Sequence, residues 1–220
     1  MAEITALPDL AADRARALAL TPVSRETLVR LDRFVTLLLD TQSHTNLIGP
    51  RSVAELWTRH IADSLQLLGV APQARGWLDL GSGGGFPGVV LACALADRPG
   101  SAVHLVESTG KKAAFLRKVC GELALPATVH HTRIEDLSLE VDADVITARA
   151  LAPLPALLDY VAPFLKPGAQ ALLLKGQDVE VELTEAAKYW NIRAELAPSQ
   201  TNPASRIVIV RGLQRRSVRS

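Results

Sequence analysis

The segment Trp77-Leu78-Asp79-Leu80-Gly81-Ser82-Gly83-Gly84-Gly85-Phe86-Pro87-Gly88 decides the fold of this chain. Its first four residues have the length and apolar character of a buried strand, with an acid, Asp79, near the end. The glycines that follow allow a sharp turn and let a ligand approach bare backbone. Pro87 suits the first turn of a helix, where its missing N–H has no partner to lose. The segment therefore predicts a strand, a glycine loop and the start of a helix.

Strand-like and helical stretches alternate along the rest of the chain. Such alternation implies right-handed crossovers and predicts an α/β fold with a doubly wound, mostly parallel sheet. In such sheets ligands bind outside the carboxyl ends of the strands, so the loops after the strands are where chemistry is expected. Strands are expected at residues 77–80, 103–106, 127–131, 143–147, 169–174, 192–196 and 207–210, and helices from 87, through 116–119, and at 154–165 and 180–189.

The first 70 residues have a different character. Apolar residues recur at helical spacing after Ser24, a second helical stretch runs over about 53–68, and residues 41–50 between them are polar and turn-like. We therefore expect an N-terminal helical extension, residues 1–70, followed by a core, residues 71–220, that forms one compact unit.

Two cofactor classes compete for the glycine loop. A dinucleotide fingerprint, G-x-G-x-x-G, should begin directly after the strand, but counted from Gly81 its last position falls on Phe86. Counted from Gly83 instead, the fingerprint matches, but it then begins two residues later than it should after the strand. Asp79 suits a cationic or hydroxyl-bearing ligand better than a pyrophosphate, and S-adenosylmethionine (SAM) carries an ammonium, a sulfonium and no phosphate. The loop thus favours SAM over NAD, with a turn that binds nothing as a third alternative.

The loops after the second and third strands offer further contacts. Glu107 follows Gly85 at about the 20-residue spacing at which an acid reaches ribose hydroxyls. In the third loop, Ile134 can cover one face of an adenine and Glu135 can contact its edge, although acids are also common at a helix N-terminus. Glu107 thus supports a cofactor that contains a ribose, but it does not distinguish SAM from NAD, because both contain one. The candidate cofactor-binding residues from these loops are Asp79, Gly81, Gly83, Glu107, Ser108, Ile134, Glu135 and Arg149.

The loop after the fourth strand, residues 147–153, limits which methyl acceptors are compatible with the sequence. It lacks the Asn/Asp-Pro-Pro-aromatic tetrapeptide that holds exocyclic amines, and no cysteine lies on a predicted ligand-facing loop to act as a nucleophile. An acceptor that needs no deprotonation fits best. Guanine N7 is one, because its lone pair attacks a sulfonium methyl directly and catalysis is then mainly orientation. Arg149 is the candidate catalytic residue, holding the cofactor carboxylate, O6 or a phosphate, unless it only pairs with an acid.

Composition excludes several other classes of protein. The 220 residues carry 24 Lys and Arg against 23 Asp and Glu, which is not the balance of a basic architectural protein. Cys93 and Cys120 are too few for a disulfide framework, and no spaced His/Cys cluster predicts a metal site. No secretory signal or membrane span is expected, so the chain reads as cytoplasmic.

Several further segments match a known family. The Gly-Phe-Pro-Gly end of the loop and the helix motif His60-x-x-Asp63-Ser64-Leu65 are the most specific of them. The chain resembles the bacterial 16S ribosomal RNA (guanine-N7) methyltransferases, the RsmG or GidB family, over nearly all of its length from about Leu28. The other matching segments are Asn46-Leu47-Ile48, Val106-Glu107-Ser108, Lys111-Lys112-x-x-Phe115-Leu116, Arg133-Ile134-Glu135, Ala148-Arg149-Ala150 and Leu174-Lys175-Gly176.

The resemblance implies a Rossmann-like class I SAM-dependent methyltransferase fold with a helical extension. It also implies methyl transfer to N7 of guanine 527, in the 530 loop of 16S rRNA, by a monomer that acts on the 30S subunit. The cofactor contacts implied are Gly81, Phe86, Ile134, Glu135 and Arg149. The candidates for RNA contact, or for a structural role beside the site, are Asn46, His60, Asp63, Ser64 and Lys175.

Some features leave alternatives open. Residues 41–45 and Thr109-Gly110 depart from the family pattern, and the first departure puts local RNA contacts in doubt. His60 reads equally well as a packing residue, and the arginines of residues 211–219 fit either phosphate binding or a solvated end. An NAD-dependent oxidoreductase and a non-catalytic RNA-binding module are the competing functions; the intact loop and Glu107 argue against the second.

Overall fold

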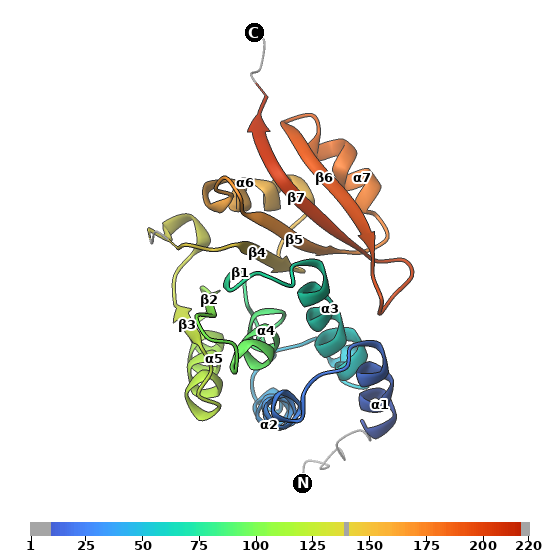
Figure 1. Cartoon of the computed structure of the whole chain (residues 1–220), viewed down its shortest axis with the longest axis vertical. Helices are drawn as coiled ribbons and strands as arrows, with labels where there is room; N and C mark the ends of the chain where they lie inside the picture. Colours follow the sequence, from blue (N-terminus) through green and yellow to red (C-terminus); the bar gives the residue numbers. More distant parts are fainter. Residues whose placement is uncertain (1–9, 139–140, 217–220) are drawn as a thin grey trace.

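The computed structural model describes residues 10–138 and 141–216, which fold around a seven-stranded sheet with helices on both faces (Figure 1). The strand order is β3-β2-β1-β4-β5-β7-β6. Neighbouring strands from β3 to β5 are parallel, whereas β7 is antiparallel to both β5 and β6. The predicted doubly wound, mostly parallel sheet is confirmed. The strands are β1 (Gly76–Leu80), β2 (Ala102–Val106), β3 (Ala127–His130), β4 (Val145–Arg149), β5 (Gln170–Lys175), β6 (Trp190–Pro198) and β7 (Arg206–Arg215).

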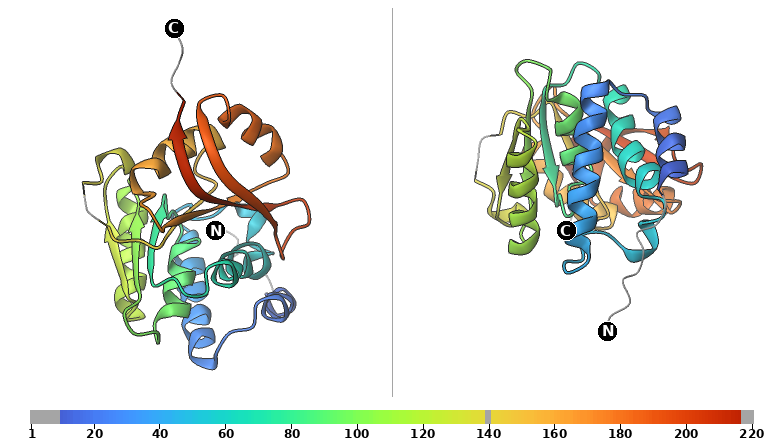
Figure 2. Two further views of the ribbon diagram at one scale, coloured as in Figure 1. Left: turned by 45° about the horizontal axis from the view of Figure 1, so that its top comes forward. Right: turned by 90° about the horizontal axis from the view of Figure 1, so that it is seen from below.

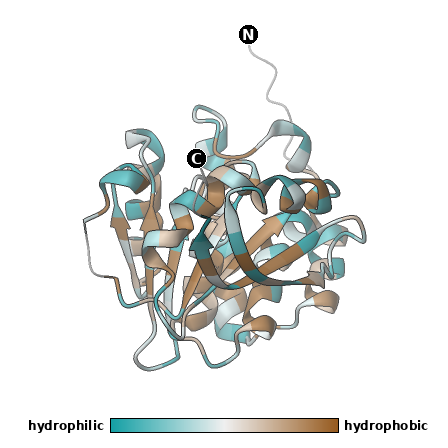
Figure 3. Cartoon of the chain, turned by 90° about the horizontal axis from the view of Figure 1, so that it is seen from above, coloured by the Kyte–Doolittle hydropathy of each residue, from teal (hydrophilic) through white to brown (hydrophobic). Residues whose placement is uncertain are grey.

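Alternate side chains of each strand enter two separate hydrophobic cores. Trp77 and Val145 pack on one face of the sheet with α4 and α5, while Leu78 and Ile146 pack on the other with α6 and α7. Because the central strands are buried on both faces, most of their residues are apolar, and the apolar interior stands out in Figure 3. These helices are α4 (Gly88–Leu95), α5 (Gly110–Glu122), α6 (Leu154–Val161) and α7 (Val179–Ala186), with short turns η3 (Ile134–Asp136) and η4 (Ala162–Phe164).

The expected N-terminal helices form and cover the α4 and α5 side of the sheet (Figure 2). Ser24 caps α2 by accepting a hydrogen bond from the backbone N–H of Thr27 at 3.1 Å. Leu31 and Phe34 of α2 belong to the same core as Trp77, so the apolar packing is continuous across residue 70. The division into residues 1–70 and 71–220 stays a prediction. The elements are α1 (Ala11–Leu20), α2 (Arg25–Gln42), η1 (Pro50–Ser52), the π-helical η2 (Trp57–Ala62) and α3 (Asp63–Val70).

A buried acid of α1 fixes the start of η2. The carboxylate of Asp13 accepts hydrogen bonds from the backbone N–H groups of Trp57 and Thr58, at 2.7 and 3.3 Å, and from the Thr58 hydroxyl at 2.5 Å. Helix starts leave such N–H groups without partners, so this side chain satisfies them in place of an ordinary cap. The position of η2 thus depends on α1.

Replacing Asp13 by alanine should destabilise the fold by about 2–4 kcal/mol, because two buried N–H groups lose their acceptor. The measurement is the free energy of unfolding in urea. Asp32 is the matched control, since its ion pair with Arg14 is partly solvated and its loss should cost less than about 1 kcal/mol. Equal losses from the two replacements would contradict the assigned role of Asp13.

Two expectations about strand length need correction. The strand expected at 143–147 is β4, Val145–Arg149, because Asp144 instead accepts hydrogen bonds from the backbone N–H groups of Arg75 and Gly76 at the start of β1. The last two strands are longer than expected and form an antiparallel hairpin.

Two arginines of the expected basic tail form ion pairs. Arg211 pairs with Glu195 at 2.8 Å and Arg215 pairs with Asp159 at 2.6 Å. Arg216 donates to Asn191 Oδ1 at 2.9 Å, and the rest of the expected basic tail, residues 217–219, lies outside the described residues.

Both cysteines are buried free thiols, as expected for a reduced interior. Burial raises the pKa of Cys93 to about 12 and that of Cys120 to about 11, which makes them poor nucleophiles. Among the described helices, none has the length and apolar character needed to cross a bilayer.

Candidate functional site

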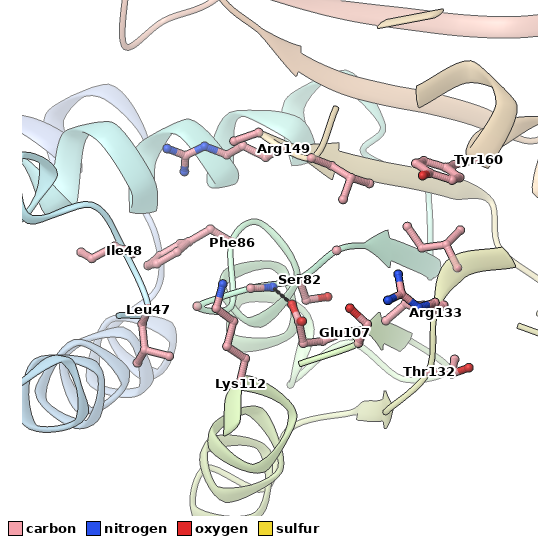
Figure 4. A pocket seen from close by; sticks show the side chains of 18 of the residues that line it. Leu47, Ile48, Ser82, Phe86, Glu107, Lys112, Thr132, Arg133, Arg149 and Tyr160 are labelled. Atoms are coloured by element: carbon pink, nitrogen blue, oxygen red, sulfur yellow. Dashed lines mark hydrogen bonds between the residues drawn. The ribbon is translucent and has the colours of Figure 1, made fainter. Parts of the chain in front are cut away.

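A cavity of about 460 Å³ lies at the carboxyl ends of β1, β2 and β4 (Figure 4). It is bounded by the glycine loop, the loop after β2, the turn η3 and the end of β4, which are the loops that the sequence singled out. Most of the predicted cofactor-binding residues line it, namely Gly81, Gly83, Phe86, Glu107, Ser108, Ile134, Glu135 and Arg149.

The backbone of the glycine loop is already heavily hydrogen-bonded. Gly81, Gly83 and Gly85 have φ values of 72°, 55° and 100°, which only glycine adopts readily. In this conformation most backbone N–H groups of the loop already donate to acceptors within the protein, so few remain for a ligand. The N–H of Gly83 donates to Glu107 Oε2 at 2.9 Å, and that of Gly88 donates to Asp79 Oδ2 at 3.1 Å. Ser82, Gly85 and Phe86 donate to backbone carbonyls.

Asp79 does not line the cavity, which corrects the expectation that it contacts the ligand. Its side chain is buried behind the loop and accepts hydrogen bonds from the Gly88 N–H and, at 2.9 Å, from the Thr147 hydroxyl. Burial raises the pKa of Asp79 to about 6, with a smaller contribution from Glu107, although the hydrogen bonds lower it. Asp79 therefore joins β1, β4 and the start of α4 and holds the loop in shape. Sequence cannot show this, because it does not say which way a strand-end acid turns.

The raised pKa of Asp79 predicts how stability depends on pH. Below an unfolded-state pKa near 3.8 the carboxyl is neutral in both states, and above about 6 it is ionised in both. As pH rises between these values, folding must therefore overcome the burial of a charge, at about 3 kcal/mol in all. Relative to Asp79→Asn, the free energy of unfolding of the unmodified chain should fall by this amount between pH 4 and pH 7, as measured in urea. Parallel pH profiles would contradict the prediction.

Glu107 stands at the centre of the cavity. Besides the bond to Gly83, its Oε1 accepts a hydrogen bond from the N–H of Thr109 at 2.6 Å, so one carboxylate joins the first two loops. Ile134 and Glu135 of η3 also line the cavity, and Arg133, just before η3, and Tyr160 of α6 lie at the end away from Phe86 and Ile48 (Figure 4). In Figure 4 the guanidinium of Arg149 points away from Tyr160, toward the end where Phe86 and Ile48 lie.

Part of the cavity wall comes from the N-terminal extension, and sequence reasoning missed it. Leu47 and Ile48 line the cavity, and Gln42 fixes them: its Oε1 accepts hydrogen bonds from both N–H groups, at 2.9 and 3.0 Å. A Cβ at Gly84 would meet the Leu47 carbonyl oxygen at 2.9 Å, so this glycine permits the close approach. The sequence feature that could have indicated this contact is the apolar pair Leu47-Ile48 within the otherwise polar residues 41–50. Also missed as lining residues were Lys112, Leu151 and Tyr160.

His60 lines this cavity and packs against Phe86, with ring centroids 4.8 Å apart and the ring planes tilted by 35°. Within the described parts of the chain, neither of its ring nitrogens has a hydrogen-bond partner. Burial, together with the positive charges of Arg149 and Arg59, lowers the pKa of His60 to about 3. The ring is therefore neutral at physiological pH and forms part of the wall next to the glycine loop.

A second cavity, of about 540 Å³, adjoins the first, and Arg149 and Ala150 line both. Its walls come from η2, α3, the end of β5 and the loop between β6 and β7. Two of the predicted RNA candidates, Asp63 and Lys175, lie here. Lys175 is engaged by Glu182 at 2.6 Å. The side chain of Arg149 therefore separates two chambers.

The remaining RNA candidates lie elsewhere. Ser64 is fully buried and donates a hydrogen bond to the His60 carbonyl at 2.6 Å, which corrects the expectation that it faces RNA. Asn46 is exposed and lines neither cavity, so its contact with RNA stays a prediction. Among the described residues no group of three or more His, Cys, Asp or Glu side chains could hold a metal ion.

Comparisons with known proteins agree with this geometry. Solved structures with a similar fold include a putative O-methyltransferase from Klebsiella pneumoniae (TM-score 0.57, 15% identity, covering 91% of this chain and 96% of that one). Another is the O-methyltransferase from Bacillus cereus in complex with SAH (TM-score 0.58, 17% identity, covering 90% and 96%). At such low identity they show the fold alone, that of class I SAM methyltransferases.

Sequence relatives are much closer. The ribosomal RNA small subunit methyltransferase G of Bradyrhizobium sp. (strain ORS 278) is 57% identical over 211 residues, which is 95% of each chain. The family model GidB, described as rRNA small subunit methyltransferase G, matches residues 27–207. The chain therefore belongs to the rRNA small subunit methyltransferase G family.

Proposed function

We propose that this protein transfers a methyl group from SAM to N7 of a guanine in 16S rRNA, guanine 527 of the 530 loop. We further propose that it acts as a monomer on the 30S subunit, in the cytoplasm. Family membership, the names of the relatives and the SAM methyltransferase fold support the activity of an rRNA methyltransferase. The base and the atom rest on the chemistry of the site and on the family resemblance.

One observation carries the choice of cofactor. Most of the N–H groups with which a glycine loop would grip a pyrophosphate are occupied here, because those of Ser82, Gly83, Gly85, Phe86 and Gly88 all donate within the protein. A diphosphate would also lie against the Glu107 carboxylate. A nucleoside with an amino-acid tail and no phosphate fits this cradle, whereas NAD does not.

The residues present suit SAM from end to end. Ile134 and Glu135 are placed for the adenine, Glu107 for the ribose hydroxyls, and Gly81, Phe86 and Arg149 for the amino-acid end. When bound, SAM supplies an electrophilic sulfonium methyl. Guanine N7 carries no proton, so the site needs no general base, and this chain's contribution is to orient the base and to exclude water.

Two binding and labelling experiments test the proposal. Isothermal titration calorimetry should show binding of SAM and none of NAD; the reverse result would end it. The protein should then transfer labelled methyl from SAM to 30S particles that lack the modification. Cleavage chemistry specific for 7-methylguanine should place the label at guanine 527. Binding of SAM without label in that loop would exclude the proposed acceptor.

Replacing Glu107 by glutamine should weaken SAM binding by about 10- to 100-fold, because the amide cannot accept from both Gly83 and Thr109 and is a poorer acceptor for a ribose hydroxyl. Calorimetry measures the change in Kd. Glu122→Gln, a partly exposed position on α5 that is outside both cavities, should leave Kd unchanged. An unaltered Kd in the Glu107 variant would remove this residue from the cofactor site.

A further inference from the structure

We propose that Asp63 and Arg149 select the target base: Arg149 donates to O6 of the guanine, and Asp63 accepts from its N1–H. This inference rests on the proposed function and deepens it, since it names the acceptor cavity and the residues that distinguish guanine from other purines. Asp63 thereby becomes a specificity-determining residue of the methyl transfer.

The position of the second cavity makes it the acceptor chamber. Among the described residues it shares Arg149 and Ala150 with the cofactor cavity, and the Arg149 guanidinium lies toward the end that holds Phe86 rather than the end that holds Tyr160. If the adenine binds at η3, the amino-acid end of the cofactor and its reactive methyl group would face that shared boundary. A base that reacts there must enter from the second cavity.

The charges of this cavity favour a neutral base over a phosphate. Three acids and three bases line it, so there is no net positive field to attract an anion. Its volume of about 540 Å³ is ample for one nucleotide. Hydroxyl and amide side chains supply further donors and acceptors. The charged residues are Glu55, Asp63 and Glu182 against Arg59, Arg149 and Lys175, and the neutral polar ones are Thr58, Thr201, Asn202 and Ser205.

Asp63 and Arg149 stand side by side with unused hydrogen-bonding capacity. Asp63 Oδ2 is 3.6 Å from Arg149 Nε, too far for a hydrogen bond. Arg149 Nη1 is buried without a partner among the described residues. Asp63 Oδ1, by contrast, is fixed by Gln66 Nε2 and by the Thr201 hydroxyl, each at 2.8 Å. The carboxylate is thus held rigidly with its second oxygen free.

A donor next to an acceptor complements one edge of guanine. O6 and N1–H are neighbouring ring positions, an acceptor followed by a donor, and the pair Arg149–Asp63 presents the opposite order. Adenine presents a donor at N6 and an acceptor at N1, so both contacts would become repulsive. A site that hydrogen-bonds the correct base rejects another base because the site's buried polar groups would then have no partners.

Asp63 also matches the change of charge during the reaction. As the N7–methyl bond forms, the sulfur–methyl bond breaks and its electron pair stays on sulfur, so the positive charge moves from the cofactor to the purine. N1–H then becomes a stronger donor, and an acceptor placed on it stabilises the transition state more than the ground state. Loss of Asp63 should therefore lower kcat as well as raise KM.

The experiment compares target bases in 30S particles reconstituted with 16S rRNA that carries guanosine, inosine or 2-aminopurine riboside at position 527. Inosine keeps O6 and N1–H, whereas 2-aminopurine has no O6 and an acceptor at N1. The unmodified protein should methylate guanosine and inosine at similar kcat/KM and 2-aminopurine at least about 100-fold more slowly. In Asp63→Asn, Oδ1 can keep its two partners while an NH2 replaces Oδ2. The guanosine to 2-aminopurine ratio should fall by about 100-fold.

Controls separate this idea from the proposed function. Asp63→Asn should bind SAM with unchanged Kd, because Asp63 does not line the cofactor cavity. Glu180→Gln, an exposed acid outside both cavities, should keep the ratio of the unmodified protein. If the unmodified protein methylates no substrate, the proposed function fails. If it methylates 2-aminopurine as fast as inosine, or if the variant slows all three bases equally, the base-selecting role of Asp63 is overturned.

Discussion

Gly88→Ala should destabilise the protein by about 3 kcal/mol or more, the largest effect on stability expected from a single methyl group in this chain. The added Cβ would lie 2.2 Å from Leu105 Cδ2 and 2.6 Å from Asp79 Oδ2. Both neighbours are fully buried between β1, β2 and α4, so neither can move aside without shifting the core. The same methyl would push apart the Gly88 N–H and the Asp79 carboxylate that shape the glycine loop.

Urea unfolding measures the loss, and Gly121→Ala is its matched control. Gly121 lies on α5 with nothing near the added carbon, so alanine there should stabilise the chain by about 0.5–1 kcal/mol. The two substitutions are chemically identical and should act in opposite directions. A Gly88 variant that unfolds at the urea concentration of the unmodified chain would contradict the close packing of α4 on β1 and β2.

Arg149→Ala should lower kcat/KM for methyl transfer by about a thousandfold or more, the largest effect on activity that we expect. In the described part of the chain Arg149 is the positively charged residue that lines both cavities, so its loss affects the cofactor and the base together. Stability should change by only about 1–2 kcal/mol, since Arg149 makes no close hydrogen bond and Asp63 keeps its bonds to Gln66 and Thr201.

A comparison with Arg149→Lys shows what the guanidinium supplies. Lysine keeps the charge and loses the planar fork, so SAM affinity should largely return whereas guanine methylation stays at least about tenfold below that of the unmodified protein. Kinetics on 30S particles and calorimetry with SAM give the two quantities. Near-normal turnover by the alanine variant, with the fold intact, would place Arg149 outside the site.

The sequence predicted those parts of the site that depend on local pattern. The strand, glycine loop and helix start at residues 76–88 follow from residue type and spacing, and Glu107 follows from its distance along the chain. The side of the loop on which Asp79 lies was predicted wrongly, because an acid at a strand end can turn toward a ligand or toward the neighbouring strand. Here Thr147 of β4 supplies a hydroxyl that holds it inside.

Contacts between distant segments were beyond sequence reasoning. Leu47 reaches the cofactor cavity because Gln42 and Gly84 let its backbone come close, and no periodicity encodes that approach. Asp63 was named from a family motif, but its environment depends on Thr201, far along the chain, whose hydroxyl fixes the carboxylate. The second cavity likewise exists only once the β6–β7 hairpin packs beside α3.

The antiparallel placement of β7 has a consequence for how new specificities evolve. The turn between β6 and β7 lies at the edge of the sheet and is not part of a crossover, so insertions there leave the parallel strands and the nucleoside cradle undisturbed. Yet this turn contributes Thr201, Asn202, Pro203 and Ser205 to the chamber for the base. Lengthening or recomposing one hairpin turn is thus a route by which a chain of this architecture could be retargeted to a different nucleotide while its methyl donor stays the same.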